Sequence, residues 1–346
     1  MIQARRIRIH KPGGYDALRV ERFAIGMPDC NQVLIEVAAI GVNYADGIIR
    51  MGLYASAKRL HGYPITPGFE VSGIVRAVGS AVDRYKPGDE VMALTLFNGY
   101  SSHLIVNEDR VFFKPATLTY DQAAAIPTVF LTAWFMVHEL AHSRPGEHWL
   151  VHSAAGGVGN ALVQLGRLSG CEVTGIVGHS EKVESARNAG CTHVIDKQTE
   201  NLWQRAGAIS PDGFEAIFDA NGVSTLAQSY KHLAATGRLC IYGFASMLPK
   251  GKGMPNWPKL IWDWLRTPRF NPLNMTQTNR SVIACNLSFL SAQGPRLICG
   301  MEWILAHFAS GELSAPSVTV FALENAAEAQ AAIESGRTVG KLVLRP

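Results

Sequence analysis

The chain has 346 residues, of which 47% are hydrophobic and only 17% are charged. This composition excludes a dominantly disordered protein and provides enough apolar residues for the cores of about two domains. A formal net charge of +4 without any long basic run disfavours nucleic acid as a partner.

The N-terminus, the cysteines and the hydropathy predict a soluble cytoplasmic protein. The longest nearly uninterrupted apolar stretch, residues 126–137, is shorter than the roughly 20 residues that a transmembrane helix requires. The basic residues at the start are not followed by an apolar segment, so they do not resemble a secretory signal. The six cysteines are scattered and form no C-x-x-C pair. We expect them to be reduced, because a chain of this length needs no disulfide for stability.

Up to about residue 125, short segments of strand character are separated by Gly and Pro. These segments predict an irregular all-β domain, with strands expected at residues 32–37, 71–78, 90–94 and 103–106.

From about residue 149, strands alternate with helix-length amphipathic segments. This pattern is typical of a parallel sheet covered by helices on both faces. Residues 317–321 and 341–344 return to strand character around an Ala-rich helix at 325–335. We expect this last segment to rejoin the first domain.

A predicted strand at residues 149–152 leads into a glycine-rich turn and an apolar helix at residues 160–168. Dinucleotide-binding folds use this order, because the glycines let the backbone approach the pyrophosphate and the helix N-terminus supplies amide donors. Ala154 stands where the usual fingerprint has its first Gly. A glycine turn without a ligand is the alternative, since the motif alone is weakly specific. The predicted cofactor-binding residues are Ala155, Gly156, Gly157, Val158 and Gly159.

The residues after the next strand, at 172–177, favour NADPH over NADH. An acid about 20 residues past the glycines would bind a ribose 2′-hydroxyl, but Gly178 occupies that position. His179, Ser180 and Lys182 follow, and they provide donors and a positive charge for a 2′-phosphate. Alternatively, Ser180 caps the following helix and Lys182 lies on its solvated side.

Later strands of the same sheet are predicted at residues 194–196, 214–219 and 237–243. Ligands of such sheets bind at the carboxyl ends of the strands. We therefore expect Asn221, Tyr242 and Gly243 to face the cofactor, and Lys197 to add to the phosphate pocket. Lys341 is expected to reach the cofactor from the C-terminal segment.

Six segments spread over essentially the whole chain resemble the medium-chain dehydrogenase/reductase family. They are GVNYAD at 41–46, RMGLY at 50–54, PGFE at 67–70, KPGDEV at 86–91, AAGGVG at 154–159 and GKLVL at 340–344. Within the family, the sequence is most similar to the zinc-free quinone oxidoreductase and zeta-crystallin branch, and especially to its subgroup related to the synaptic-vesicle amine-transport protein. YGFAS at 242–246 and the Trp-rich insertion after it carry that closer similarity.

The resemblance implies an α/β fold in which a Rossmann doubly wound parallel sheet is joined to an irregular GroES-like β-barrel domain. The implied GroES-like catalytic domain covers residues 1–125 and 291–346, and the implied Rossmann dinucleotide-binding domain covers residues 126–290. The implied assembly is a homodimer.

Zinc-dependent members of the family carry Cys where this chain has Asn43 and His where it has Phe69, and they carry a four-Cys lobe that this chain lacks. Neither an amide nor a phenyl ring replaces a thiolate or an imidazole on zinc. The resemblance therefore implies a zinc-independent enzyme without a metal site, in which Glu70 remains from the zinc pattern as a structural or cofactor-proximal acid.

A second zinc pattern needs a separate interpretation. The segment from His138 to His142 matches the H-E-x-x-H motif of zinc proteases. The dinucleotide strand begins soon afterwards at Trp149, which leaves no scaffold for a protease cleft. We interpret the motif as the end of a helix, where His is favourable near the negative end of the dipole.

The resemblance implies that NADPH reduces a quinone or another α,β-unsaturated carbonyl compound by hydride transfer. Asn43 and Tyr54 are then candidate donors to the oxygen that gains charge, and Thr132 is similar to the residue that lies near the nicotinamide. Arg50 is a further candidate. For Asn43 and Tyr54, a turn amide and a half-buried aromatic ring are the structural alternatives.

Two other functions remain open. One is an enoyl-thioester or alkenal reductase that uses the same hydride chemistry. The other is a low-turnover NADPH-binding protein with a structural or membrane-associated role. Tight NADPH binding without reduction of any quinone or enone would indicate the second.

The insertion at residues 254–270 places three Trp residues among basic side chains. We predict a short helix with an apolar stripe formed by Leu260, Ile261, Trp264 and Leu265. Trp and basic side chains are also typical of an interfacial membrane anchor. Because so short a stripe anchors weakly by itself, we instead predict a cleft wall or a subunit contact.

Overall fold

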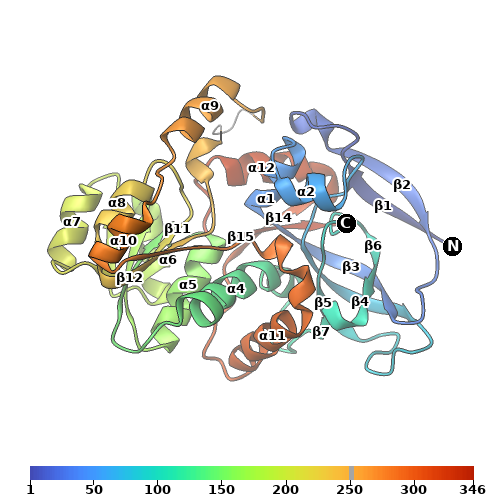
Figure 1. Cartoon of the computed structure of the whole chain (residues 1–346). Coiled ribbons are helices and arrows are strands. Elements are labelled where there is room, and N and C mark those ends of the chain that lie inside the picture. The colour runs from blue at the N-terminus through green and yellow to red at the C-terminus, as the bar shows by residue number, and fades with distance from the viewer. Residues whose placement is uncertain (249–252) are drawn as a thin grey trace. The chain divides into compact units, whose positions relative to one another are not determined.

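Figure 1 shows the computed structural model of the chain, which describes residues 1–248 and 253–346. The chain divides into two compact units. Unit 1 comprises Met1–Leu131, Gly253, Met254 and Ser288–Pro346, and unit 2 comprises residues 132–248 and Pro255–Leu287. A mainly antiparallel sheet in unit 1 and a parallel sheet in unit 2 confirm the predicted α/β fold class.

The sheet of unit 1 has seven strands in the order β14-β15-β3-β4-β5-β7, with β6 paired to β3. The C-terminal strand β15 pairs with β3 in antiparallel register, Leu342 opposite Val42. Strands β1 and β2 form a separate antiparallel pair. The strands are β1 (Ile2–Arg8), β2 (Arg19–Ile25), β3 (Gln32–Val42), β4 (Glu70–Val78), β5 (Glu90–Leu94), β6 (His103–Asn107), β7 (Val111–Phe113), β14 (Val318–Ala322) and β15 (Lys341–Arg345).

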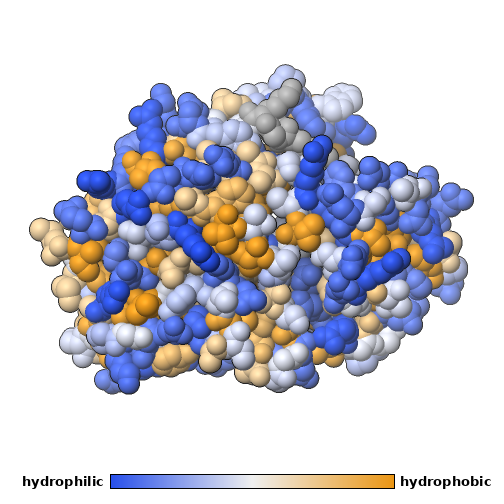
Figure 2. Space-filling view, turned by 180° about the vertical axis from the view of Figure 1, so that it is seen from behind, coloured by the Kyte–Doolittle hydropathy of each residue, from blue (hydrophilic) through white to orange (hydrophobic). Residues whose placement is uncertain are grey.

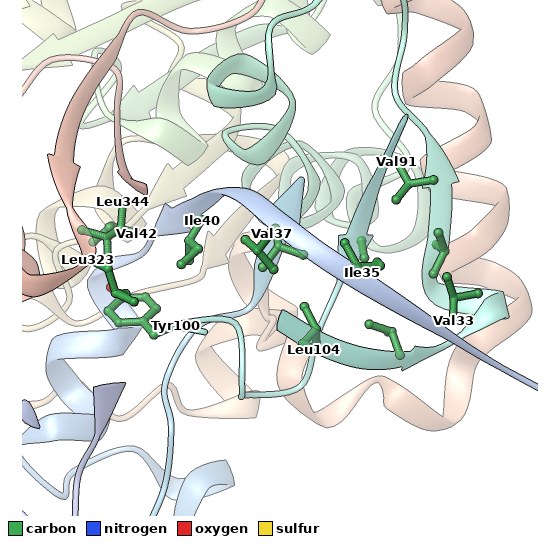
Figure 3. Packing of buried hydrophobic residues seen from close by; sticks show 14 of the residues in the cluster. Val33, Ile35, Val37, Ile40, Val42, Val91, Tyr100, Leu104, Leu323 and Leu344 are labelled. Carbon is green, nitrogen blue, oxygen red and sulfur yellow. The ribbon is translucent and has the colours of Figure 1, made fainter. Parts of the chain in front are cut away.

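The core of unit 1 follows a change of register in β3. Val33, Ile35 and Val37, at every second position, point into the core. After Val37 the alternation shifts by one residue, so that Ile40 and Val42 point into the core (Figure 3). The pairing of β3 with β4 is irregular just after Val37. An extra residue at such a point reverses which face the later side chains occupy. All five side chains are therefore buried.

The helices of unit 1 lie between and after these strands. They are α1 (Tyr44–Arg50), α2 (Ala55–Leu60), α3 (Tyr120–Ala124), α11 (Gly294–Ala309) and α12 (Ala326–Glu334), with 3-10 turns η1 (Tyr15–Ala17), η2 (Glu108–Arg110), η7 (Ser291–Gln293) and η8 (Leu323–Asn325). Helix α4 (Pro127–Trp134) crosses the boundary at residue 131, and the turn η6 (Leu287–Phe289) crosses the one at residue 287.

Unit 2 is built on a six-stranded parallel sheet in the order β10-β9-β8-β11-β12-β13. This is the doubly wound order, in which the second and third strands are added on one side of the first, β8, and the next three on its other side. The change of side lies between β8 and β11. The strands are β8 (His148–His152), β9 (Glu172–Val177), β10 (His193–Asp196), β11 (Phe214–Asp219), β12 (Leu233–Ile241) and β13 (Ser281–Ala284). The strand predicted at 237–243 ends at Ile241, so Tyr242 and Gly243 follow it directly.

The helices of unit 2 connect these strands. They are the π-helix η3 (Phe135–Ala141), α5 (Gly157–Leu168), η4 (Ser180–Lys182), α6 (Val183–Ala189), α7 (Leu202–Ile209), α8 (Leu226–Lys231), η5 (Ala245–Met247), α9 (Trp257–Arg266) and α10 (Pro272–Thr278). Among the helices of the described residues, none is long and apolar enough to span a bilayer. On the face shown in Figure 2, apolar residues are interspersed with polar ones.

Candidate functional site

The glycine turn of unit 2 joins β8 to α5 through a tightly packed backbone. Ser153 has a φ of 57°, which is unusual for a residue with a side chain. A Cβ on Gly159 would lie 2.1 Å from the carbonyl oxygen of Ser153, so only glycine lets the helix pack this closely on the turn. The close packing of α5 on the turn thus depends on glycine at position 159.

The N-terminus of α5 presents amide donors that are not used within the helix. Gly156 is its N-cap, and no side chain caps the helix. The amides of Gly157, Val158 and Gly159 in the first turn have no partner within the helix. Gly156 to Val158 are partly exposed, while Ala155 is buried. An uncapped helix start with reachable amides and a positive dipole end fits a pyrophosphate.

Basic side chains gather where β9 and β10 end. Gly178 leaves open space, because a Cβ built there meets no atom within 4 Å. Lys182 is only 8% exposed. Burial lowers its pKa, Glu181 raises it, and the nearby charge of Lys197 lowers it again. A ligand of high negative charge, such as a phosphate, would offset the effect of the Lys197 charge on Lys182.

Ser180 has a different hydrogen bond from the one expected at this position. Its hydroxyl donates to the carboxylate of Asp196 at the end of β10. This hydrogen bond is the main reason why the pKa of Asp196 is lowered. The hydroxyl hydrogen of Ser180 is therefore already used within the protein, whereas its neighbour His179 is partly exposed.

The ends of β11 and β12 meet the end of β8, as the sheet order requires. The side-chain nitrogen of Asn221 lies 3.1 Å from Nδ1 of His152. The hydroxyl of Tyr242 donates to the carbonyl oxygen of His152 at 3.3 Å, and burial raises the pKa of Tyr242. A Cβ on Gly243 would lie 2.7 Å from the carbonyl oxygen of Ala220. The structure thus brings Asn221, Tyr242 and Gly243 to one edge, beside the glycine turn.

Unit 1 holds a buried polar cluster around Glu70, which is 0% exposed. Its Oε1 receives Nζ of Lys341 at 2.6 Å and the amide of Asn43 at 2.8 Å. Its Oε2 receives the backbone N–H of Thr128 at 2.7 Å. Lys341 also donates to Oδ1 of Asn43 at 2.5 Å. Both ends of the Asn43 amide are therefore fixed, and Lys341 is held inside unit 1.

The other two candidate catalytic residues lie in different units. Tyr54 is the N-cap of α2, and its hydroxyl lies 2.6 Å from that of Ser288, which is also in unit 1. The Tyr54 ring makes an edge contact with Phe69. Thr132 lies on α4 at the start of unit 2 and is partly buried.

Arg50 is a structural residue in this fold. It is 0% exposed, and its guanidinium donates to Glu334 at 2.6 Å, to Gln330 at 2.7 Å and to the carbonyl oxygens of Gly13 and Gly253. All three of its nitrogens thus have protein acceptors. Its neighbourhood joins α1, α12 and the segment at Gly253, and the sequence showed none of these long-range partners.

The sequence also showed no sign of a second buried acid, Asp46. It is 0% exposed and accepts from the backbone N–H of Asn43 at 2.8 Å, from the N–H of Gly68 at 3.1 Å and from the hydroxyl of Tyr100 at 3.0 Å. Burial outweighs these bonds and raises the pKa of Asp46 to about 7.

The two zinc patterns have different surroundings. Asn43 and Phe69, which occupy the positions of the zinc ligands in zinc-dependent relatives, lie beside Glu70. The Glu70 carboxylate already has the Lys341 ammonium as its partner. The H-E-x-x-H segment lies at the end of a helix, as expected: its first four residues belong to the π-helix η3, and its last, His142, is the C-cap in a left-handed conformation with φ 48°. Within residues 1–248 and 253–346, no group of three or more His, Cys, Asp or Glu is arranged to hold a metal.

Comparisons with known proteins agree across the chain. The model of the alcohol dehydrogenase GroES-like domain matches residues 29–120, and that of the zinc-binding dehydrogenase matches residues 157–290. The human synaptic vesicle membrane protein VAT-1 homolog is 32% identical over 96% of this chain and 84% of its own length.

Solved structures show the same similarity. The Escherichia coli quinone oxidoreductase complexed with NADPH has a TM-score of 0.85 and 29% identity, with 99% of this chain and 100% of that chain covered. The CurK enoyl reductase has a TM-score of 0.84 and 27% identity, with 99% of each chain covered.

Proposed function

Because the chain belongs to the medium-chain dehydrogenase/reductase family, we propose that it is an NADPH-dependent, zinc-independent reductase of quinones or other α,β-unsaturated carbonyl compounds. The observation that carries this proposal is the edge of the parallel sheet at β8, where the uncapped start of α5 adjoins the ends of the neighbouring strands. The similar quinone oxidoreductase from Escherichia coli was solved with NADPH. We further propose that the protein is cytoplasmic and forms a homodimer.

The residues of unit 2 fit each part of the cofactor. The amides of residues 157–159 would hold the pyrophosphate. Lys182 and Lys197 favour the 2′-phosphate of NADPH. Gly178 leaves space for this phosphate, whereas an acidic side chain at this position would fill the space and repel the phosphate. When bound, NADPH supplies the hydride.

The residues of unit 1 would stabilise the substrate oxygen. Reduction of a quinone or an enone adds one hydride to the acceptor, and the oxygen that gains charge then takes one proton. The ammonium of Lys341, held by Glu70 and Asn43, places a positive charge in the cluster. With the hydroxyl of Tyr54, it provides polar hydrogens of the kind that stabilise such an oxygen. We assign the proton itself to solvent.

Binding and turnover assays test this proposal. Titration calorimetry should show that NADPH binds more tightly than NADH, and steady-state assays should show reduction of benzoquinones or enones. Elemental analysis should find no stoichiometric zinc, and chelators should leave the activity unchanged. The similarity to CurK enoyl reductase makes enoyl thioesters the necessary comparison substrates. Activity that is confined to enoyl thioesters would favour the alternative, an enoyl-thioester reductase.

A second candidate, a membrane-associated protein with little turnover, is favoured by helix α9. Its stripe residues Ile261, Trp264 and Leu265 are 58%, 66% and 58% exposed, and Trp257 on the same side is 60% exposed. The helix instead buries Asp263, which pairs with Lys259. Because these side chains are exposed, a second subunit and a lipid surface are both candidate occupants of the stripe.

The charge of this segment suits an anionic lipid surface. Residues 249–270 contain five of the 32 basic residues and one of the 28 acidic residues, so 27 of each remain in the rest of the chain. The whole net charge of +4 therefore lies in this segment. Trp side chains together with basic residues are typical of interfacial helices.

Co-sedimentation with vesicles of phosphatidylcholine and phosphatidylserine separates the two occupants. Membrane association predicts binding that salt weakens and that Trp264→Ala removes, whereas Phe113→Ala, which truncates an exposed aromatic residue on β7, leaves it unchanged. A subunit contact instead predicts no vesicle binding, and a dimer in analytical ultracentrifugation that Trp264→Ala dissociates.

A further inference from the structure

A chain of buried polar groups lies under the edge of the sheet in unit 2. His152, the last residue of β8, is 0% exposed. Its Nδ1 lies 3.1 Å from the side-chain nitrogen of Asn221, and its Nε2 lies 3.1 Å from the hydroxyl oxygen of Ser229 on α8. The Ser229 hydroxyl in turn donates to Oδ2 of Asp219 at 2.8 Å. All four groups belong to unit 2, and Asp219 and Ser229 are also 0% exposed.

The hydrogen bonds that link these four polar groups can run in one direction only. The amide nitrogen of Asn221 can only donate, so Nδ1 of His152 must be the acceptor and carry no proton. The proton of the neutral imidazole is then on Nε2, which donates to Ser229, and Ser229 donates to the carboxylate. Burial lowers the pKa of His152 and Lys197 lowers it further, although Asp219 acts in the opposite direction. The imidazole is therefore neutral, as this order requires.

Reversal of these hydrogen bonds would leave one oxygen of a buried carboxylate without its donor. If the Asn221 amide turned over, its oxygen would face Nδ1, the proton would move there, and Nε2 would accept from Ser229. Oδ2 of Asp219 would then lose the hydroxyl. A buried carboxylate oxygen that loses its donor is costly. The other oxygen, Oδ1, keeps the N–H groups of Asn221 and Gly222 and the hydroxyl of Thr225 in either arrangement, so the cost falls on Oδ2. Asp219 thus determines the direction of all the hydrogen bonds from Asn221 to Ser229.

These residues have the composition of a hydrolase triad but not its order. In a triad, the serine hydroxyl points to the histidine and the carboxylate binds the other ring nitrogen. Here the Ser229 hydroxyl donates to the carboxylate, and an amide binds the other nitrogen. With His152 and Ser229 completely buried, the arrangement cannot act as a nucleophile on a substrate, but it can hold a neighbouring group in place.

We propose that His152 is a positioning residue, which holds the Asn221 amide with its nitrogen inward and its oxygen outward as an acceptor for a donor group of the bound dinucleotide. Asn221 is partly exposed and follows β11 at the crossover of the sheet. A ribose hydroxyl and the nicotinamide carboxamide are the donors that a dinucleotide offers. This inference rests on the proposed function for the identity of the ligand, but the hydrogen-bond order stands without it.

Nitrogen NMR of the histidine rings in the full chain at pH 7, without ligand, tests the order itself. The expected result is that His152 is neutral, with a protonated Nε2 and an unprotonated Nδ1. A proton on Nδ1 would overturn the proposal. In the Ser229→Ala variant, Nε2 of His152 keeps only a separation of 3.7 Å from Oδ2 of Asp219, which is too long for a hydrogen bond, so the ring should become a mixture of the two tautomers.

A matched pair of variants tests the effect on the ligand. Ser229→Ala and Thr225→Ala each remove one hydroxyl donor from Asp219, but only Ser229 contacts His152. Both should lower the midpoint of thermal unfolding to a similar extent. Only Ser229→Ala should raise the Kd for NADPH, by about tenfold, and equal effects of the two variants on this Kd would show a merely structural role. If the parent protein binds no dinucleotide, the proposed function fails, and the tautomer measurement still decides the hydrogen-bond order.

Discussion

Removal of the Lys341 ammonium should expose how strongly the buried cluster of unit 1 depends on charge pairing. Lys341 and Glu70 have 3% and 0% exposed side chains and lie 2.6 Å apart. In the Lys341→Met variant, the carboxylate would keep only the N–H donors of Asn43 and Thr128. Loss of one partner from a buried ion pair costs about 3–5 kcal/mol, because the other charge remains buried. We expect a decrease of this size in the free energy of unfolding.

The double variant distinguishes charge pairing from loss of packing. Glu70→Gln in the Lys341→Met background removes the unpaired charge, so stability should return to within about 2 kcal/mol of the parent protein. Urea unfolding followed by circular dichroism measures this, since six of the seven Trp residues lie in unit 2 and fluorescence would report mainly on that unit. Lys86→Met, at an exposed lysine, is the control. A loss in Lys341→Met no larger than in this control, or a further loss in the double variant, would refute the reasoning.

Three more predictions follow from single positions. Lys182→Ala should weaken the binding of NADPH by about 1.5–3 kcal/mol more than that of NADH in calorimetry, and equal losses would contradict the assignment of the 2′-phosphate site. Gly41→Ala places a Cβ 2.3 Å from the carbonyl oxygen of Ala124, so it should destabilise the fold by about 1–3 kcal/mol, whereas Gly207→Ala, on α7 with no atom within 4 Å, should not. Burial raises the pKa of Asp46 from 3.8 to about 7, so the folded state holds this proton more tightly than the unfolded chain, and stability should fall as the pH rises through this range. Asp46→Asn should lack that decrease in pH-dependent unfolding.

The parallel sheet and the glycine turn could be predicted because their signals are local. Strands β9 and β11 occupy the predicted residues 172–177 and 214–219, since each is a short apolar run between turn residues. The strand, turn and helix around Gly156 follow one another without interruption, so backbone chemistry alone indicated the order. The crossover of the sheet then placed Asn221 and Tyr242 near His152.

The irregularity of β3 could not be predicted, because it is defined by the partner strand. The segment predicted at 32–37 continues to Val42, and the shift after Val37 moves Ile40 and Val42 onto the core face. Strict alternation assigns these two residues to the opposite face. No local residue pattern indicates the extra residue after Val37, since Ala and Ile are compatible with either face of a strand.

Side-chain partners that are distant in the sequence were equally invisible. The sequence placed Ser180 and Lys182 together as phosphate ligands, because both follow β9. In the fold, the Ser180 hydroxyl meets Asp196 from the neighbouring strand, while Lys182 lies near Lys197 from that same strand end. Strand pairing, and not sequence proximity, therefore decides which groups surround each of these two side chains.

The pairing of Glu70 with Lys341 explains how this chain retains an acid of the zinc pattern without the thiolate and imidazole of that pattern. A carboxylate that is 0% exposed needs a cation or several donors to remain charged. Lys341 provides the cation from the C-terminal strand β15, and β15 pairs with β3 directly before Asn43. The same ammonium orients the Asn43 amide, so one side chain both neutralises the buried acid and fixes the candidate donor beside it. A metal at this position would have to displace an ion pair that is already formed, and its remaining neighbours, an amide and a phenyl ring, offer it weak ligation or none.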